Sequence, residues 1–122
     1  MTRSAKSRAP SHRLSRIETE IMRELAILIE REIEDPRIKN VNITRVKISP
    51  DLRHARIFFT VLDDKLAEKV THGLKHAVTY LRRRIGETLS LRVVPELIFT
   101  YDQALRKAEH LMELIDRLDS EK

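Results

Sequence analysis

The chain has 122 residues, no cysteine and a formal net charge of +5, with a sequence pI near 9.8. This length suits one domain that buries a hydrophobic core without covalent cross-links. The absence of cysteine excludes disulfides and thiolate metal sites, so we expect the protein to be cytoplasmic. The longest apolar runs fall far short of the roughly 20 residues of a membrane-spanning helix, and no apolar stretch follows the basic N-terminus as in a secretory signal.

The N-terminal part predicts a flexible basic arm followed by a helix. Residues 1–12 are rich in Ser, Arg and Ala, include a proline and lack apolar periodicity. From Leu14 onward, apolar residues recur at steps of three and four, which predicts an amphipathic helix with Ser11 as its N-cap. Because the residue before a proline avoids helical angles, Asp35-Pro36 predicts the end of this helix near Glu34.

The next segment predicts a β-hairpin. Residues 41–49 alternate apolar and polar side chains and are rich in β-branched residues, as in a strand. The alternation slips once, which indicates a bulge near Thr44-Arg45 or a later start of the strand. Residues 49–52 are of types that are common in turns, and the alternation of apolar and polar side chains over residues 55–61 predicts the second strand.

A long helix is predicted next. Apolar steps run from Leu66 to Leu89, and Asp63-Asp64 can cap the helix start. Gly73 and Thr79 weaken the helix near its middle, where a bend is permitted. Residues 95–101 then predict a third strand, residues 105–118 a final helix and residues 119–122 a short C-terminal tail.

These elements predict one α+β domain over residues 13–118, with the order α-β-β-α(α)-β-α. Three strands with helices on one face make two layers. Because a long helical crossover joins strands two and three, those strands are expected to be parallel, and the three-stranded sheet is expected to be mixed.

Basic charge concentrates in the middle of the chain and at its N-terminus. Residues 41–62 and 63–94 each carry a net charge of +3, whereas 14–40 and 95–122 are net acidic. If the middle segments cluster in space, the domain presents one positive surface, which favours RNA binding without catalysis. One alternative is a protein-binding adaptor that uses its acidic outer helices. Another is a nuclease built on Asp63-Asp64, for which helix capping is the simpler explanation.

Three stretches carry a resemblance to a known family: Arg13–Ile17 with Glu34–Arg37, Val46–Ile57, and Leu89–Asp102. In this order and at this spacing the chain resembles ribosome-binding factor A, a bacterial small-subunit assembly factor. The resemblance implies a type II KH-like domain that binds the free small ribosomal subunit during late rRNA maturation, with no cofactor. It also implies a releasing partner such as a GTPase, and we expect a monomer.

In that family a helix-kink-helix carries Ala-x-Gly, and the corresponding kink here falls on Ala77, Val78 and Thr79. The chain has only Gly73 and Gly86, so a Gly-x-x-Gly loop that grips bases is not expected. Contact is expected through phosphates and basic side chains. The candidate RNA-binding residues are Lys75, Arg82, Arg83, Arg84 and Arg92, then Arg45, Lys47, Arg53 and Arg56 of the hairpin, and Arg3, Lys6 and Arg8 of the arm.

Simpler interpretations exist for several of these residues. Arg82–Arg84 spread over most of a helix circumference, so they cannot all face one ligand, and the alternative is a solvated helix face. Phe58 and Tyr80 point away from the predicted core faces, where packing explains them better than base stacking. His72 and His76 have metal-ligand spacing but no third ligand, so no metal is expected.

Overall fold

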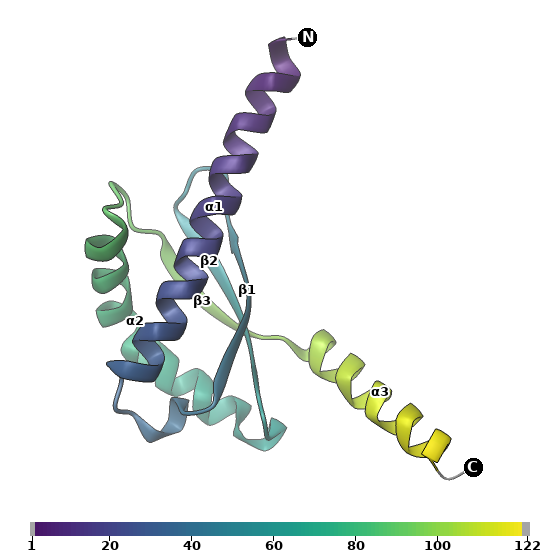
Figure 1. Ribbon diagram of the computed structural model, residues 1–122. Helices are drawn as coiled ribbons and strands as arrows, with labels where there is room; N and C mark the ends of the chain where they lie inside the picture. Colours follow the sequence, from purple (N-terminus) through teal and green to yellow (C-terminus); the bar gives the residue numbers. More distant parts are fainter. Residues whose placement is uncertain (1, 121–122) are drawn as a thin grey trace.

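The computed structural model describes residues 2–120, with side chains described from residue 12 onward. Three α-helices, two short 3-10 helices and three strands follow one another along this part of the chain (Figure 1). In chain order they are α1 (Thr2–Arg31), η1 (Pro36–Ile38), β1 (Val41–Ile48), β2 (His54–Val61), η2 (Asp64–Leu66), α2 (Ala67–Leu89), β3 (Glu96–Tyr101) and α3 (Gln103–Ser120).

The sheet has the order β1-β2-β3, with β1 antiparallel and β3 parallel to β2. The predicted mixed sheet is therefore confirmed. The register of β1 against β2 shifts between Ile43 and Arg45, so Thr44 is the extra residue of a bulge. This bulge accounts for the slip in the apolar alternation, because the residues on both sides of it keep their apolar side chains on one face.

The core lies between one face of the sheet and helices α1 and α2. On β2 the residues Ala55, Ile57 and Phe59 are fully buried, whereas the alternating Arg56 is exposed. The apolar stripes of the two helices cover this face, and the opposite face of the sheet is open. The core residues that the helices contribute are Ile17, Ile21, Leu25, Leu28, Ile29, Val70, Leu74, Leu81 and Ile85.

Helix α1 differs from its predicted bounds at both ends. Its backbone is helical from Thr2, so Ser11 lies inside the helix and is not its N-cap. Ala, Lys and Arg residues of the predicted arm favour helix, and they extend the amphipathic segment toward the N-terminus. At the other end α1 stops at Arg31, three residues before the predicted Glu34. Asp35 instead caps η1, because its Oδ1 accepts a hydrogen bond from the backbone N–H of Arg37 at 2.9 Å.

Helix α2 is one continuous hydrogen-bonded helix, and Figure 1 shows that its axis changes direction near the middle. The assignment of this bend to Ala77–Thr79 stays a prediction. Asp63 caps η2 by accepting from the Lys65 N–H at 3.0 Å, and η2 then leads into α2. Asp63 therefore caps the 3-10 turn, and neither aspartate caps α2 itself.

Gly73 marks the closest approach of α2 to the segment before β1. A Cβ atom at this position would lie 2.6 Å from Cγ2 of the buried Ile38, which is closer than two carbon atoms can pack. Glycine therefore allows α2 to pack against η1 at this point, at the cost of some helix propensity.

Helix α3 points away from the sheet and the other helices (Figure 1). All but one of its residues are exposed, including Leu111, Met112 and Leu118. The helix continues to Ser120, so residues 119 and 120 of the predicted tail are helical, and the rest of that tail lies outside the described residues. None of the helices in residues 2–120 is long and apolar enough to cross a membrane.

Candidate nucleic-acid interface

The predicted basic residues form two separate surfaces, because the sheet and its core lie between them. On the strands, Arg45, Lys47 and Arg56 alternate with buried apolar residues, so they project from the open face of the sheet. The residues of α2 lie on the opposite side of the core. The single positive surface expected from the charge distribution is therefore wrong, and two smaller ones replace it.

On the open face, Arg45, Lys47 and Arg56 form what we call the sheet-face cluster. Lys47 lies directly opposite Arg56 in the β1–β2 register, and Arg45 lies opposite Phe58. The Arg45 guanidinium sits 4.6 Å from the centroid of the Phe58 ring, in cation–π geometry. This contact half-buries Phe58 and orients Arg45, so Phe58 supports an arginine and does not offer a clear stacking platform.

On the other side, exposed residues of α2 form a stripe at helical spacing. The α2 stripe consists of Lys69, His72, Lys75, His76, Thr79 and Arg83. Steps of three and four place these side chains on one helix face, opposite the core residues. No acidic residue occurs between Glu68 and Glu87, so the stripe is positive or neutral throughout.

Sequence reasoning missed Lys69 and the two histidines as members of this stripe. The signal was present, because the stretch without acidic residues between Glu68 and Glu87 also shows the three-and-four spacing on its polar side. The two histidines also have the spacing of metal ligands on a helix. In the part of the chain with described side chains, no three His, Asp or Glu side chains come together in a way that could hold a metal ion.

Two of the three consecutive arginines have partners inside the domain. Arg82 is half-buried and donates from Nε to the carbonyl of Pro95 at 3.1 Å and from Nη2 to that of Val94 at 3.0 Å. It therefore anchors the loop before β3. Arg83 is exposed, lies 5.4 Å from the centroid of the Tyr80 ring and reaches Glu87 only at 3.9 Å, so it remains available to a ligand.

Arg84 joins α2 to α1. Its Nε lies 3.1 Å from Oε1 of Glu32, and its Nη1 lies 3.1 Å from Glu87. The Tyr80 hydroxyl also donates to Glu32. Hydrogen bonds from Tyr80 and then from Arg84 hold the pKa of Glu32 below its ordinary value, so this carboxylate stays charged and holds both groups. Tyr80 and Arg84 are thus parts of the fold, and Arg83 is the exposed member of the triplet, with only a long contact to Glu87 and a cation–π contact to Tyr80.

The remaining predicted residues lie at the periphery. Arg53, in the exposed hairpin turn, accepts the Glu96 N–H on its carbonyl at 2.8 Å, which places it beside the start of β3. Arg92 is exposed in the loop that leads to the same strand end. The side chains of the predicted arm residues Arg3, Lys6 and Arg8 lie outside the described part, so their role stays a prediction.

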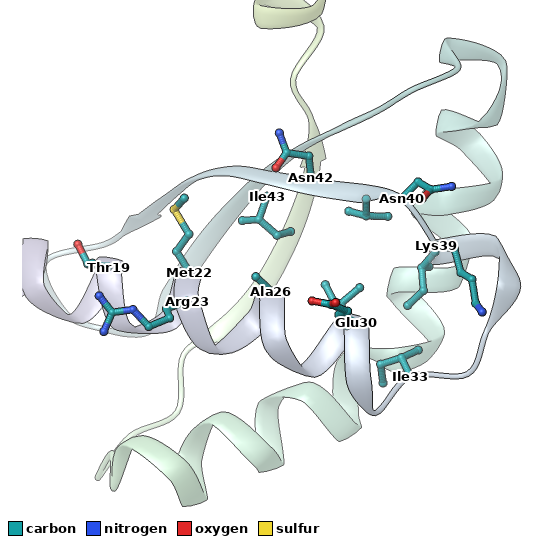
Figure 2. Close-up of a pocket in the computed structure, with 13 residues that line it drawn as sticks. Thr19, Met22, Arg23, Ala26, Glu30, Ile33, Lys39, Asn40, Asn42 and Ile43 are labelled. Atoms are coloured by element: carbon teal, nitrogen blue, oxygen red, sulfur yellow. The ribbon is translucent and has the colours of Figure 1, made fainter.

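A groove of about 840 Å³ runs between α1 and the edge strand β1 (Figure 2). Met22, Ala26 and Ile43 line it, and Arg23 and Glu30 stand among the polar residues around it. Seven of its thirteen lining residues are apolar, and none is a serine, cysteine or histidine.

The aspartate pair that suggested a nuclease has structural partners. Asp63 caps η2, and Asp64 accepts from the Tyr101 hydroxyl and from Nε of Arg106 at 3.1 Å. The hydrogen bond from Tyr101 is the main cause that lowers the pKa of Asp64, while burial is the main cause that raises the pKa of Tyr101 to about 12. Asp63 therefore serves turn formation, and Asp64 connects η2 to the end of β3 and the start of α3.

Comparison with known proteins identifies one family. The family model described as ribosome-binding factor A matches residues 13–115. A ribosome-binding factor A of Pseudomonas paraeruginosa is 44% identical over 112 residues, 89% of this chain and 88% of that protein. The crystal structure of ribosome-binding factor A from Thermus thermophilus shares the fold, with a TM-score of 0.66 and 23% identity over 72% of this chain and 94% of that one. A homology model of the Thermus thermophilus factor, fitted into a cryo-EM map of its 30S complex, has a TM-score of 0.62 and 24% identity over 72% and 93% of the two chains.

Proposed function

Because the chain belongs to the ribosome-binding factor A family, we propose that it binds the free small ribosomal subunit and assists late maturation of its rRNA without catalysis. Phosphate contacts by arginine and lysine supply much of the affinity of such proteins, and they need exposed cations without acidic neighbours.

The α2 stripe is the observation that carries this proposal. Lys69, Lys75 and Arg83 are exposed on one helix face, and the sequence between Glu68 and Glu87 contains no acidic residue. A bystander surface usually mixes both signs of charge, as α3 does with its alternating acidic and basic residues. Every charge that the stripe carries is instead opposite in sign to that of the phosphate backbone.

Co-sedimentation tests the proposal. The purified protein is centrifuged through sucrose with free small subunits, with large subunits and with assembled ribosomes at moderate salt. We expect it to travel with free small subunits and to bind assembled ribosomes more weakly. Failure to travel with small subunits, or equal binding to assembled ribosomes, would contradict the proposed function. Raising the salt should weaken binding by about 0.7 to 0.9 log units per log unit of salt for each phosphate contact.

Three further parts of the proposal follow from family membership. A factor that assists maturation has to leave the finished subunit, and we propose that a GTPase releases it. We also propose that the protein acts in the cytoplasm and as a monomer. The mass of the isolated protein by light scattering tests the last point, and release from small subunits on addition of a candidate GTPase with GTP tests the first.

A further inference from the structure

The sheet-face cluster places like charges next to one another, an arrangement that does not stabilise the fold. Lys47 and Arg56 are directly opposite each other across β1 and β2, an arrangement that destabilises a sheet. Within residues 12–120, none of Arg45, Lys47 and Arg56 has a carboxylate within salt-bridge distance. Glu96, an exposed carboxylate on the same face, lies 3.6 Å from His54. The three cations of the cluster are therefore available to an anion from outside the domain.

This cluster cannot share one short ligand with the α2 stripe. Arg56 is exposed on the open face of β2, while its neighbour Ile57 is fully buried in the core that α2 covers. The sheet and α2 together separate the two surfaces. Helix α2 alone is about 10–12 Å across when its side chains are included. Their cations also point in opposite directions. An RNA segment on one surface would have to pass around an edge of the domain to reach the other.

We propose that the sheet-face cluster is a second RNA-binding site, so that the domain bridges two separate segments of phosphate backbone, one on each surface. The proposal rests on the proposed function and adds a role to it. Bridging supplies selectivity without reading bases, because two weak contacts bind tightly only where two RNA segments lie at the spacing of the two surfaces. Once one RNA segment is bound to the first surface, the linked second segment meets the other surface at an effective concentration of the order of millimolar.

The test is capture of a second RNA by the intact protein. One RNA oligonucleotide, too short to pass around the domain, is attached to beads, and a second, fluorescent copy is added with the protein. We expect the wild-type protein to retain the fluorescent RNA on the beads. Analytical ultracentrifugation of the complex formed in solution should give one protein for two RNAs. A mass that contains two proteins would show bridging by a dimer and would overturn the proposal.

Three double variants with the same change in charge separate the surfaces. Lys47→Glu with Arg56→Glu changes the sheet-face cluster, and Lys75→Glu with Arg83→Glu changes the α2 stripe. Lys107→Glu with Arg117→Glu on α3 is the control, because both residues are exposed and belong to neither surface. We expect the first two variants to bind one RNA, to lose the second, and to bind small subunits at least tenfold more weakly than the control.

A neutral variant guards against misfolding. Replacement of Lys47 and Arg56 by glutamine removes the repulsion across the strands, so its melting temperature should equal or exceed that of the wild type while capture of the second RNA falls. If the sheet-face variants capture the second RNA and bind small subunits like the control, the second site does not exist. If instead the wild-type protein fails to bind small subunits at all, the proposed function fails, whatever the bead assay shows.

Discussion

Replacement of Arg82 by methionine should lower stability and spare RNA binding. The guanidinium donates at 3.1 and 3.0 Å to two carbonyls of the loop before β3. Methionine keeps the apolar stem but leaves both carbonyls without this donor, which costs about 1–3 kcal/mol for a half-buried group. In a domain of this size each kcal/mol lowers the melting temperature by about 4 °C. We expect thermal unfolding followed by circular dichroism to show a fall of about 4–12 °C.

The matched control is Arg83→Met, one residue along the same helix. Arg83 is exposed, so its loss should change stability by no more than about 0.5 kcal/mol. The Arg83→Met change should, however, make the slope of log affinity for RNA against log salt concentration less steep by about 0.7 to 0.9, which is the contribution of one phosphate contact. Anisotropy titrations over a salt series, well below both melting temperatures, measure this slope. Equal loss of RNA binding in the two variants, with unchanged stability in both, would refute the division of roles.

Three other predictions concern the fold. Gly73→Ala should lower the urea midpoint, because overpacking against Ile38 costs about 1–3 kcal/mol and outweighs a helix gain of about 1 kcal/mol; a higher midpoint would contradict the close packing. The lowered pKa of Glu32 contributes stability that is complete above the ordinary pKa of 4.5 and is lost as the pH falls through the lowered value. Glu32→Gln should therefore flatten the acid side of a plot of urea midpoint against pH, and an unchanged acid side would count against the link to α2. Tyr101, with a pKa raised to about 12, contributes stability that is lost as the pH rises from 10 through 12, and Tyr101→Phe should remove the latest phenolate step from an ultraviolet titration. A latest step that survives this change belongs to another tyrosine.

The sequence predicted the elements because each strand and helix has its own apolar period. The register slip at Thr44 was visible in the alternation of residues 41–48, and the helical crossover indicated a parallel pair before any contact was known. The start of α1 was missed because the predicted arm has no apolar stripe, so its helix depends on backbone propensity and on the helix that follows it.

The candidate site was only partly predictable, because a sequence does not show which way a charged side chain points or which group it contacts. Arg82, Arg83 and Arg84 look equivalent along the chain, yet Arg84 finds Glu32 at a separation of 52 residues and Arg82 finds carbonyls 12 and 13 residues away. Such partners arise only when α1 and the loop before β3 pack on α2. The division of the cations between two surfaces was missed for the same reason. The net charge of a segment adds up the side chains on both faces of a sheet and does not show how they are distributed between the faces.

The bulge at Thr44 also sets how this protein can change in evolution. Before the bulge, Ile43 points into the core; after it, Val46 does so, and Arg45 is left on the open face. Deletion of Thr44 alone would remove the bulge and leave a regular alternation, in which Ile43 and Val46 still face the core and Arg45 the open face. Deletion of a residue on either side of the bulge would instead reverse the side chains beyond it, which buries charge or exposes the core. The bulge is thus a place where β1 can lose one residue without exposing the core.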